Sequence, residues 1–529
     1  MLEKENNEIT SPQVFINQIE FNDTTKLSLN HNSVVVFTGP NNCGKSLVLR
    51  DIEKCVQHPE SSSIVVRSLE RSHIGEVDES FLSSRMNGDE MGRYWVESHG
   101  RSLSQWSEDW VRGNLSLLAN FFISRLDTKE RLLASESKQL LGNSVYEKRN
   151  SLHKVYEDDK KEAIISSFFF EAFNEKLVVN RRAGQFVSLH IGSPPDRDEL
   201  KMSDEREFYH AVARLPKLDS QGDGMRSFAS ILLDNFTSNY SATLIDEPEA
   251  FLHPPQARLL GKMLAKHNPN ERQLFISTHS QDFLQGLLDA ENDNVTIIRI
   301  NRKNSVNHMS LLDSESIKKL WSNPILKYTN ILSGLFHAKV VVCESDYDCL
   351  FYQAVMNAMC ESHDTISPDI LFTHCGGKDR IKDVVSALVA VNVPVAAICD
   401  FDLLNDRSKF KAIISAFGAK WEGLLSADMK VIYDSMNIQK DSWAKIKRIG
   451  KAGFNGDAPA AYEAVESACK KIGLFIVPVG EMECFDKTIN KEKREWVYHV
   501  LENSDLSQSV QLSEARTFIQ SIVEFIPSI

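Results

Sequence analysis

The chain has 529 residues, 42% apolar and 25% charged, which is enough for about three ordinary globular domains of ~150 residues each. Its 60 lysine and arginine residues are outnumbered by 73 aspartate and glutamate residues. The formal net charge of −13 argues against a protein that coats nucleic acid non-specifically. Any contact with nucleic acid must therefore use a local basic patch.

The first ten residues, MLEKENNEIT, are polar and acidic, and the chain contains no apolar run of about 18 residues. This pattern disfavours both secretion and membrane spanning, so we expect a cytoplasmic protein with no membrane partner. The nine cysteines include neither a CxxC motif nor a Cys/His run. The sequence therefore signals neither a zinc site nor a disulfide framework, and most thiols are expected to be buried and reduced.

The first predicted elements form a strand, loop and helix unit. Apolar strands are expected at 14–21 and 33–37, and a helix is expected at 45–56, where apolar residues recur at helical spacing. Between the second strand and the helix, residues 39–46 read GPNNCGKS and match GxxxxGKS. This is the structural context that a phosphate-binding loop requires.

The segment 39–46, here called the glycine loop, carries the expected contacts to nucleotide. Its backbone can wrap round phosphates, and the N-terminus of the following helix adds positive potential. Lys45 can reach the β- and γ-phosphates, and Ser46 can bind Mg²⁺. The loop residues predicted to bind the cofactor ATP are Gly39, Asn42, Gly44, Lys45 and Ser46.

Residues 100–176 are charged and predicted to be mostly helical. Within them, 144–177 indicates one or two long helices, so we expect an inserted helical arm at about 130–176. The apolar cluster 168–170, FFF, needs burial, which makes this arm a candidate second dimerisation surface.

After a predicted hairpin at 176–192, short apolar strands alternate with helices, the pattern of a parallel α/β sheet. The strand 241–246 ends in Asp246 and Glu247. Asp246 can hold the Mg²⁺ shell, and Glu247 can polarise the attacking water. The Thr-His-Ser sequence after the next strand offers His279 as a contact to the γ-phosphate.

Upstream of this strand, residues 220–227 read SQGDGMRS and precede a helix; they are called the signature segment below. The hydroxyl and backbone amide groups of Ser220, Gly222 and Gly224 could bind a phosphate at the N-terminus of that helix.

These motifs arrive in the order used by ATP-binding-cassette (ABC) ATPases and resemble that superfamily. The resemblance implies a divergent signature loop that completes the ATP site of the opposite protomer, so a homodimer or higher homo-oligomer is expected. EPEAFLHP and STHS, with a short helical insertion, resemble the overcoming-lysogenization-defect (OLD) ATPases more closely than SMC-type repair ATPases. LDTKERL, which contains Asp127 and Arg131, also resembles a loop of the OLD group.

A second α/β series begins near residue 335, after a connection that contains Pro324 and Gly334. We therefore expect an ATPase domain at 1–330 and a second domain at 335–529. The strands expected in the second domain are 338–344, 369–375, 394–400 and 474–479.

Acidic residues follow several of these strands. Carboxylates at the C-terminal edge of a parallel sheet can together bind a divalent metal. A Glu after one strand and an Asp-x-Asp after another resemble the Toprim fold, as do Gly376 and Gly377 before a helix, and the late acids resemble those of OLD nucleases. The predicted metal ligands are Glu344, Asp348, Asp400, Asp402, Glu481 and Glu483, besides Ser46 and Asp246 at the nucleotide. One departure from the Toprim pattern is Ser345, where a glycine usually follows the first Glu.

The whole chain thus resembles an OLD-family protein, an α/β chain with an ABC-type ATPase head, a helical insertion and a C-terminal Toprim domain. The resemblance implies an ATP-dependent endonuclease that nicks or cleaves DNA, in bacterial anti-phage defence of a retron- or Gabija-like kind. Two Mg²⁺ or Mn²⁺ ions would activate water and stabilise the leaving 3′-oxygen. We place Glu344, Asp348 and Glu481 on one side of this site, and Asp400 and Asp402 on the other.

The basic stretch KIKRIGKAG is the candidate nucleic-acid contact. Lys451 could stabilise charge in the transition state, while Lys445, Lys447 and Arg448 could hold the phosphate backbone. The alternative for this stretch is a solvated helix face.

Two other functions stay open. The chain could be a partner-gated sensor or effector ATPase of a defence complex, for instance with a retron reverse transcriptase and its DNA. It could also be a Toprim RNase acting on tRNA, since two-metal chemistry neither requires nor forbids a 2′-hydroxyl.

Overall fold

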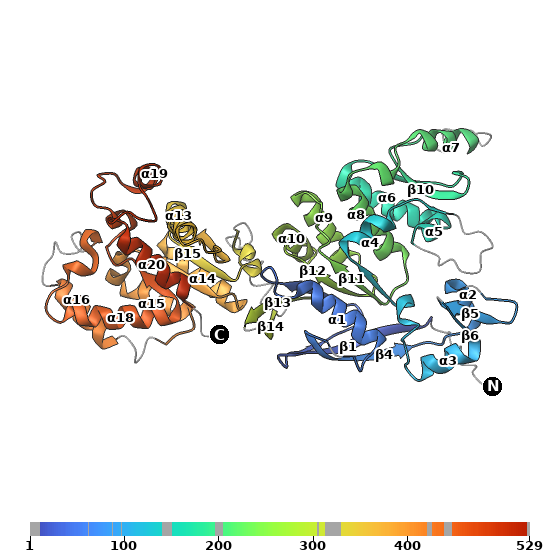
Figure 1. Cartoon of the computed structure of the whole chain (residues 1–529), viewed down its shortest axis with the longest axis horizontal. Coiled ribbons are helices and arrows are strands. Elements are labelled where there is room, and N and C mark those ends of the chain that lie inside the picture. Colours follow the sequence, from blue (N-terminus) through green and yellow to red (C-terminus); the bar gives the residue numbers. More distant parts are fainter. Residues whose placement is uncertain are drawn as a thin grey trace, which may run out of the picture. The chain divides into compact units, whose positions relative to one another are not determined.

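The computed structural model divides into two compact units, Met1–Ser314 and Glu315–Ile529. Figure 1 labels their helices and strands. The predicted connection at 322–337 lies partly outside the described residues, which are 11–61, 63–86, 88–96, 98–139, 151–195, 205–303, 306–312, 330–420, 426–437 and 447–525.

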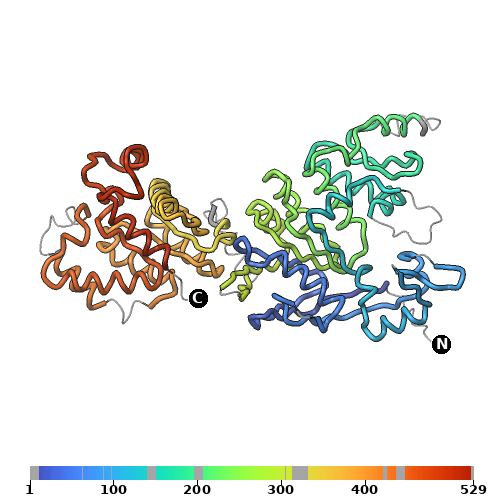
Figure 2. The backbone as a smooth tube through the Cα atoms, in the orientation of Figure 1, coloured from blue at the N-terminus to red at the C-terminus, as the bar shows by residue number. Residues whose placement is uncertain are grey.

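A mixed six-stranded sheet, with strand order β14-β13-β3-β12-β11-β7, forms the centre of the first unit. All neighbouring strands pair in parallel except β13 and β14. The order brings the strand before the glycine loop next to strands from residues 273–303 (Figure 2). The strands are β3 Val34–Thr38, β7 Ile123–Leu126, β11 Ala242–Asp246, β12 Gln273–Ser277, β13 Val295–Lys303 and β14 Val306–Leu312.

Helices cover both faces of this sheet. Figure 1 shows α1 (Lys45–Gln57) on one side and α8 (Asp223–Thr237), α9 (Pro254–Lys266) and α10 (Gln281–Asp289) on the other. The central strands are buried along nearly their whole length, as expected of parallel strands covered on both faces. The predicted parallel α/β organisation is confirmed.

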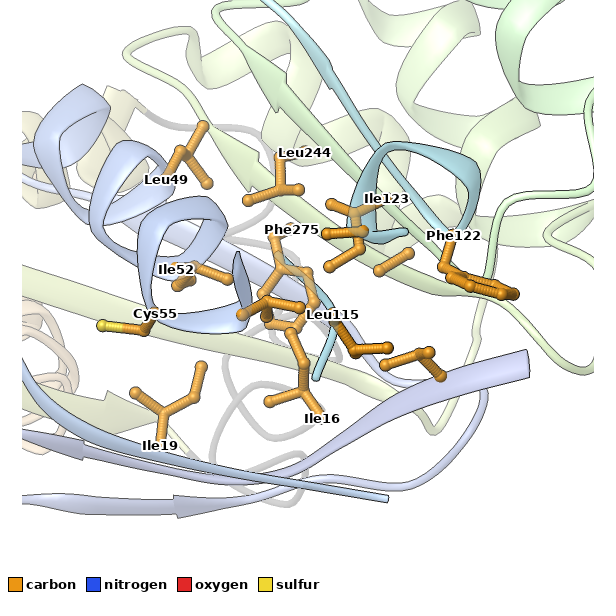
Figure 3. Packing of buried hydrophobic residues seen from close by; sticks show 14 of the residues in the cluster. Ile16, Ile19, Leu49, Ile52, Cys55, Leu115, Phe122, Ile123, Leu244 and Phe275 are labelled. Atoms are coloured by element: carbon orange, nitrogen blue, oxygen red, sulfur yellow. The ribbon is translucent and has the colours of Figure 1, made fainter. Parts of the chain in front are cut away.

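Helix α1 lies between this sheet and an antiparallel sheet of order β2-β1-β4. Figure 3 shows Ile52 of α1 in one cluster with Ile16 of the antiparallel sheet and Phe275 of β12, and none of the three is exposed by more than 1%. Burial of each such side chain contributes about 1.5–3 kcal/mol. This core fixes the helix that begins at the glycine loop. The sheet consists of β1 Gln13–Phe21, β2 Lys26–Ser28 and β4 Val66–Ile74.

Residues 100–176, predicted to be mostly helical, are only partly helical. Strand β7, within this range, belongs to the central sheet. Helices α5 and α6 are separated at Asp158, whose side chain caps α6. The remaining elements of the unit are α2 Glu79–Arg85, β5 Arg93–Val96, β6 His99–Ser102, α3 Leu103–Val111, η1 Ala119–Phe121, α4 Thr128–Ala134, β8 Lys138–Gln139, α5 Ser151–Tyr156, α6 Asp159–Phe173, β9 Leu177–Asn180, β10 Phe186–Ile191, α7 Glu205–Arg214 and η2 Leu218–Ser220.

The phenylalanine cluster of α6 is largely covered within the chain. Phe169 is fully buried, with its ring 6.3 Å from that of Phe228 on α8. The ring of Phe168 lies 4.8 Å from that of Phe236, and only Phe170 is exposed, at 43%. Helix α8 thus supplies most of the burial that the cluster needs, and a second dimerisation surface in this region stays a prediction.

Asp234 on α8 is a buried carboxylate whose Oδ1 accepts a hydrogen bond from the Ser124 hydroxyl at 3.2 Å. Burial raises the pKa of Asp234 from 3.8 to about 6, and Arg272 opposes that shift only in part. Between these two values the unfolded chain loses the proton more readily than the folded chain. Ionisation of Asp234 therefore reduces the free energy of unfolding as the pH rises through this window, and the loss is complete above the folded pKa.

We expect Asp234→Asn to remove this pH dependence. Relative to the wild type, the variant should gain stability between pH 4.5 and pH 7, by up to about 3 kcal/mol. Urea unfolding of both proteins at pH 4.5, 5.5 and 7 measures the difference. A stability difference that does not change with pH would contradict the expectation.

The second unit contains a parallel four-stranded sheet of order β16-β15-β17-β18. All four strands lie where the sequence predicts them. Aromatic side chains of α13, α19 and α20, among them Phe351, Trp496 and Phe518, pack against Phe475 of β18 in the main core. The strands are β15 Lys339–Cys343, β16 Ile370–His374, β17 Val395–Cys399 and β18 Leu474–Ile476.

The other elements of this unit connect and cover these strands: η3 Asn330–Phe336, α13 Asp346–Ser362, η4 Lys378–Arg380, α14 Ile381–Ala390, η5 Phe401–Asn405, α15 Arg407–Ala416, α16 Ser426–Asn437, η6 Gly450–Gly453, α18 Ala458–Ile472, η7 Met482–Phe485, α19 Lys493–Asn503 and α20 Ser513–Glu524. None of the described helices in either unit has both the length and the apolar character that crossing a membrane requires.

Candidate functional site

The glycine loop lies between β3 and α1, and its backbone has the left-handed turns that such a loop needs. The φ angles of Gly39, Asn42 and Gly44 are 140°, 63° and 99°. A Cβ atom on Gly39 would lie 2.2 Å from the carbonyl oxygen of Ile300, so only glycine fits at this position.

Lys45 follows this turn and is 8% exposed. Its Nζ donates hydrogen bonds to the carbonyl oxygens of Gly39 and Pro40, both at 2.9 Å. The ammonium group thus lies against the loop, and Ser46 is beside it in the first turn of α1. The contacts of both residues with nucleotide stay predictions.

Asp246 and Glu247 begin the acidic turn, defined here as residues 246–249, at the carboxyl end of β11. The Ser277 hydroxyl donates a hydrogen bond to Asp246 Oδ1. The Glu247 backbone N–H donates to the Ser277 carbonyl oxygen at 2.9 Å. Glu247 has a φ of 49°, a conformation that costs a non-glycine residue about 1 kcal/mol or more and needs support from its surroundings.

His279 lies beside two carboxylates of this turn, with Nδ1 at 3.4 Å from both Glu247 Oε1 and Glu249 Oε1. The hydrogen bond with Glu247 raises the pKa of His279, and the same bond lowers the pKa of Glu247. The Glu247 side chain is 39% exposed. It is therefore an ionised and accessible carboxylate, as a general base must be.

Glu249 has a different role, which sequence reasoning missed. Its carboxylate accepts hydrogen bonds from the Thr278 hydroxyl at 2.8 Å and from the His279 backbone N–H at 2.9 Å. Burial raises the pKa of Glu249. Glu249 is enclosed, and its Oε1 holds the Thr-His-Ser segment beside the acidic turn, while the Glu247 side chain stays accessible. The sequence signal for this residue was the second glutamate of the Glu-Pro-Glu sequence at 247–249.

Helix α8 begins at Asp223, inside the signature segment, so this segment is a short loop followed by the first helical turns. Ser220 and Gly222 are exposed, and the Ser220 hydroxyl donates to the Lys217 carbonyl at 2.7 Å. A Cβ atom on Gly224 would lie 2.6 Å from the Phe251 carbonyl oxygen. The segment therefore packs against the residues that follow the acidic turn and leaves its start open to solvent.

The carboxylate cluster of the second unit, defined as Glu344, Asp348, Asp400, Asp402 and Glu481, lies at the C-terminal edge of the parallel sheet. The Asp400 backbone N–H donates to Glu344 Oε1 at 3.3 Å. Burial raises the pKa of Glu344 to about 7. Burial, and secondarily the charge of Glu344, raises the pKa of Asp400 well above its usual range. The fold therefore brings the predicted acids together.

Ser345 has a structural role that explains the departure from glycine. Its hydroxyl and backbone N–H donate to Asp348 Oδ2 at 3.0 Å and 2.8 Å, and the Ser345 hydroxyl accepts from the Asp348 N–H at 3.3 Å. This capping box starts α13 and contributes about 1 kcal/mol. It also fixes the orientation of the Asp348 carboxylate.

Two lysines pair with the cluster. Lys378 Nζ lies 2.9 Å from Asp402 Oδ2. Lys447 Nζ lies 2.6 Å from Glu481 Oε1 and 3.8 Å from Asp402 Oδ2, and the bond to Glu481 raises the pKa of Lys447. Lys378, which follows the Gly376-Gly377 turn, was not among the predicted site residues; its position after a glycine pair near a strand end was the available signal.

The other predicted residues of this unit make contacts outside the cluster, although the charge of Glu483 contributes to the raised pKa of Asp348. Lys451 is exposed on η6, and its backbone N–H donates to the Pro478 carbonyl at 2.9 Å. Arg448 faces the exposed Glu492 at 3.6 Å. Glu483 Oε1 accepts from the Lys493 N–H at 2.7 Å. Lys445 lies outside the described residues.

The carboxylate cluster has the chemistry of a site for Mg²⁺ or Mn²⁺, which prefer carboxylate oxygens. Asp402 Oδ1 is buried and has no hydrogen-bond partner among the residues that the structure describes. Over the same residues, no three His, Cys, Asp or Glu side chains form a ready-made metal site. The chemistry of the donors suits a divalent cation, but their arrangement in this structure does not form a metal site, and Asp402 and Glu481 pair with lysines instead.

Two family models match the chain. One, described as "AAA domain, putative AbiEii toxin, Type IV TA system", matches residues 109–284, a range that contains the acidic turn and His279 but not the glycine loop. The other, "Overcoming lysogenization defect protein-like, TOPRIM domain", matches residues 335–402.

A curated relative, the Old nuclease of Escherichia phage P2, is 23% identical over 356 residues, which is 60% of this chain and 58% of the relative. The chain thus matches little more than half the length of that protein.

Among solved structures, an Smc head bound to the C-winged helix domain of ScpA aligns with 58% of this chain and 99% of its own, at 12% identity and a TM-score of 0.35. An SMC head domain from Thermotoga maritima aligns with 57% of this chain and 100% of its own, at 13% identity and a TM-score of 0.28.

The family models and the two α/β sheets together show an ATPase domain of the AAA type in the first unit and a Toprim domain in the second. Its second unit matches the OLD-like Toprim family, and over part of its length the chain is similar to the Old nuclease.

Proposed function

We propose that this chain is an ATP-hydrolysing, divalent-metal-dependent endonuclease that nicks or cleaves DNA, acting in bacterial antiviral defence. One observation carries the nuclease assignment: acids from three strand ends gather at one edge of the sheet, and two lysines pair with them. Burial, with a smaller contribution from the neighbouring acids, raises the pKa of Glu344 to about 7, and such perturbed acids are a feature of functional sites. The defence role rests on the family resemblance.

For ATP hydrolysis, the glycine loop holds the phosphates, and Lys45 contacts the β- and γ-phosphates. Asp246 and Ser46 would hold the Mg²⁺ shell. Glu247 accepts the proton of the attacking water through its ionised carboxylate, and His279 contacts the γ-phosphate while sharing a hydrogen bond with Glu247.

The signature segment is proposed to contact the nucleotide bound by a second copy of the chain. The exposed positions of Ser220 and Gly222 at the start of α8 support this assignment, because a phosphate can approach that helix N-terminus from solvent. A homodimer in which ATP lies between the two heads follows from it.

For strand cleavage, Glu344, Asp348 and Glu481 would hold one divalent ion, and Asp400 and Asp402 would hold the other. The ions would supply an activated water and stabilise the leaving oxygen. Lys378 and Lys447 bring positive charge to the cluster and can bind the phosphates that flank the cut. Lys451, on the neighbouring turn, extends this basic surface.

The proposal predicts that the purified protein converts supercoiled plasmid to nicked or linear DNA with Mg²⁺ or Mn²⁺, and that EDTA stops the reaction. Parallel reactions with and without ATP give the sign of the coupling between the domains. Gel electrophoresis of plasmid and of tRNA, incubated side by side, identifies the substrate. Cleavage of tRNA alone would replace DNA with RNA as the substrate, and cleavage of neither would favour a partner-gated effector.

A further inference from the structure

Arg131 on α4 connects two parts of the ATPase site. It is completely buried. Its guanidinium donates to the carbonyl oxygens of Asp246 and Glu247, the latter at 3.0 Å, and to the Ser227 hydroxyl at 3.0 Å. One side chain therefore bonds both to the acidic turn and to the helix that carries the signature segment.

Further contacts fasten α4 and the residues after it to the same helix. The Ser230 hydroxyl donates to the Arg131 carbonyl oxygen, and the Arg226 guanidinium donates to the Leu132 carbonyl oxygen at 3.0 Å. The Ser137 hydroxyl donates to Asp219 Oδ2, just before the signature segment, at 2.6 Å. A displacement of α8 would therefore displace α4 with it.

The Glu247 backbone is held from two directions. Its N–H is bonded to β12 through Ser277, and its carbonyl oxygen is bonded to Arg131. A strained φ of 49° persists only where the surroundings enforce it, so loss of either bond would let the carboxylate change direction. The direction of the general base thus depends on Arg131.

We propose that Arg131 is a positioning residue for ATP hydrolysis, which aligns Glu247 according to the position of the signature helix α8. When the signature segment of a protomer contacts the nucleotide of its partner, Arg131 transmits that engagement to the protomer's own general base. This inference rests on the proposed ATPase and its shared dimer sites, and it adds a link by which the two sites of the dimer influence each other.

The test compares Arg131→Met and Arg131→Lys, whose side chains have similar lengths, with Ser227→Ala, which removes one acceptor of the guanidinium. Arg181→Met is the matched control. Arg181 is another largely buried arginine, with a side chain 15% exposed, that bonds to Asp159 and to the Tyr156 carbonyl oxygen away from the acidic turn. For every variant, kcat and KM of ATP hydrolysis, the Kd of a non-hydrolysable ATP analogue and the melting temperature are measured.

We expect Arg131→Met to lower kcat about tenfold or more with KM and Kd unchanged, and Arg131→Lys to recover part of that loss, because an ammonium can still donate to the two carbonyl oxygens. Ser227→Ala should lower kcat by a smaller factor. Arg181→Met should retain the wild-type kcat even where its melting temperature changes. A role in packing alone would make lysine no better than methionine.

Equal kcat in the wild type, Arg131→Met and Ser227→Ala would overturn the inference, as would an equal loss in Arg181→Met. If Arg131→Met does not fold, Ser227→Ala decides, and an unchanged kcat there overturns the inference. A wild type that binds the analogue but turns over no more ATP than Lys45→Ala would instead refute the proposed ATPase, and this inference with it.

Discussion

Replacing Asp400 with alanine is expected to abolish DNA cleavage while ATP hydrolysis continues. Asp400 follows the central strand β17 and lies in the interior of the carboxylate cluster, against Glu344. A metal at such a site contributes several kcal/mol to the transition state, and each 1.4 kcal/mol is a factor of ten in rate. We therefore expect a loss of roughly a hundredfold or more in the rate of plasmid nicking.

The same variant should fold at least as well as the wild type. Burial beside other acids raises the pKa of Asp400, so removal of the carboxyl group relieves repulsion. Asp379→Ala is the matched control, since Asp379 is an exposed acid of the same unit paired with Lys409. An unchanged melting temperature with no cleavage supports the assignment, whereas metal-dependent cleavage by Asp400→Ala would exclude it.

Replacing Glu247 with glutamine should lower ATP turnover by roughly a hundredfold or more while ATP binding persists, because an amide cannot accept the proton of the attacking water. The dimer would then stay in its ATP-bound form. Since the hydrogen bond with Glu247 is the main cause of the raised pKa of His279, that pKa should also fall. Phosphate release, size-exclusion chromatography with ATP and NMR titration of His279 measure the three effects.

Glu249→Gln is the informative comparison. Its amide oxygen can still accept the hydrogen bonds from Thr278 and His279, so we expect a smaller loss of turnover. If Glu249→Gln stopped hydrolysis and Glu247→Gln did not, the roles assigned to these two glutamates would have to be exchanged.

The sequence was sufficient for features that are local or strongly periodic. Buried strands such as β3 and β17 appear as short apolar runs, and the glycine loop has its own spacing between a strand and a helix. Because parallel strands place their carboxyl ends at one edge, the approach of Glu344 to Asp400 also followed from the motif positions.

What the sequence could not supply depends on packing between distant segments. The sequence around Phe169 does not indicate that α8 packs over this side chain, so the apolar cluster was interpreted as an exposed surface. The hydrogen bond from Arg131 to Glu247 joins residues that are 116 positions apart in sequence. The hydrogen bond from Lys378 to Asp402 joins the segments that follow two different strands, β16 and β17. The capping box of Ser345 and Asp348, in contrast, is a local pattern that could have been recognised.

The lysines paired with the carboxylate cluster have a thermodynamic consequence. Lys378 and Lys447 pair with carboxylate oxygens of the cluster. In the proposed function, an incoming divalent ion would bind these same oxygens. Each oxygen that the ion takes frees an ammonium group to neutralise a phosphate of DNA. Metal and DNA would then bind cooperatively, each raising the affinity for the other by the same factor. The enzyme would hold its metal weakly until nucleic acid is present, which confines hydrolysis to the bound strand.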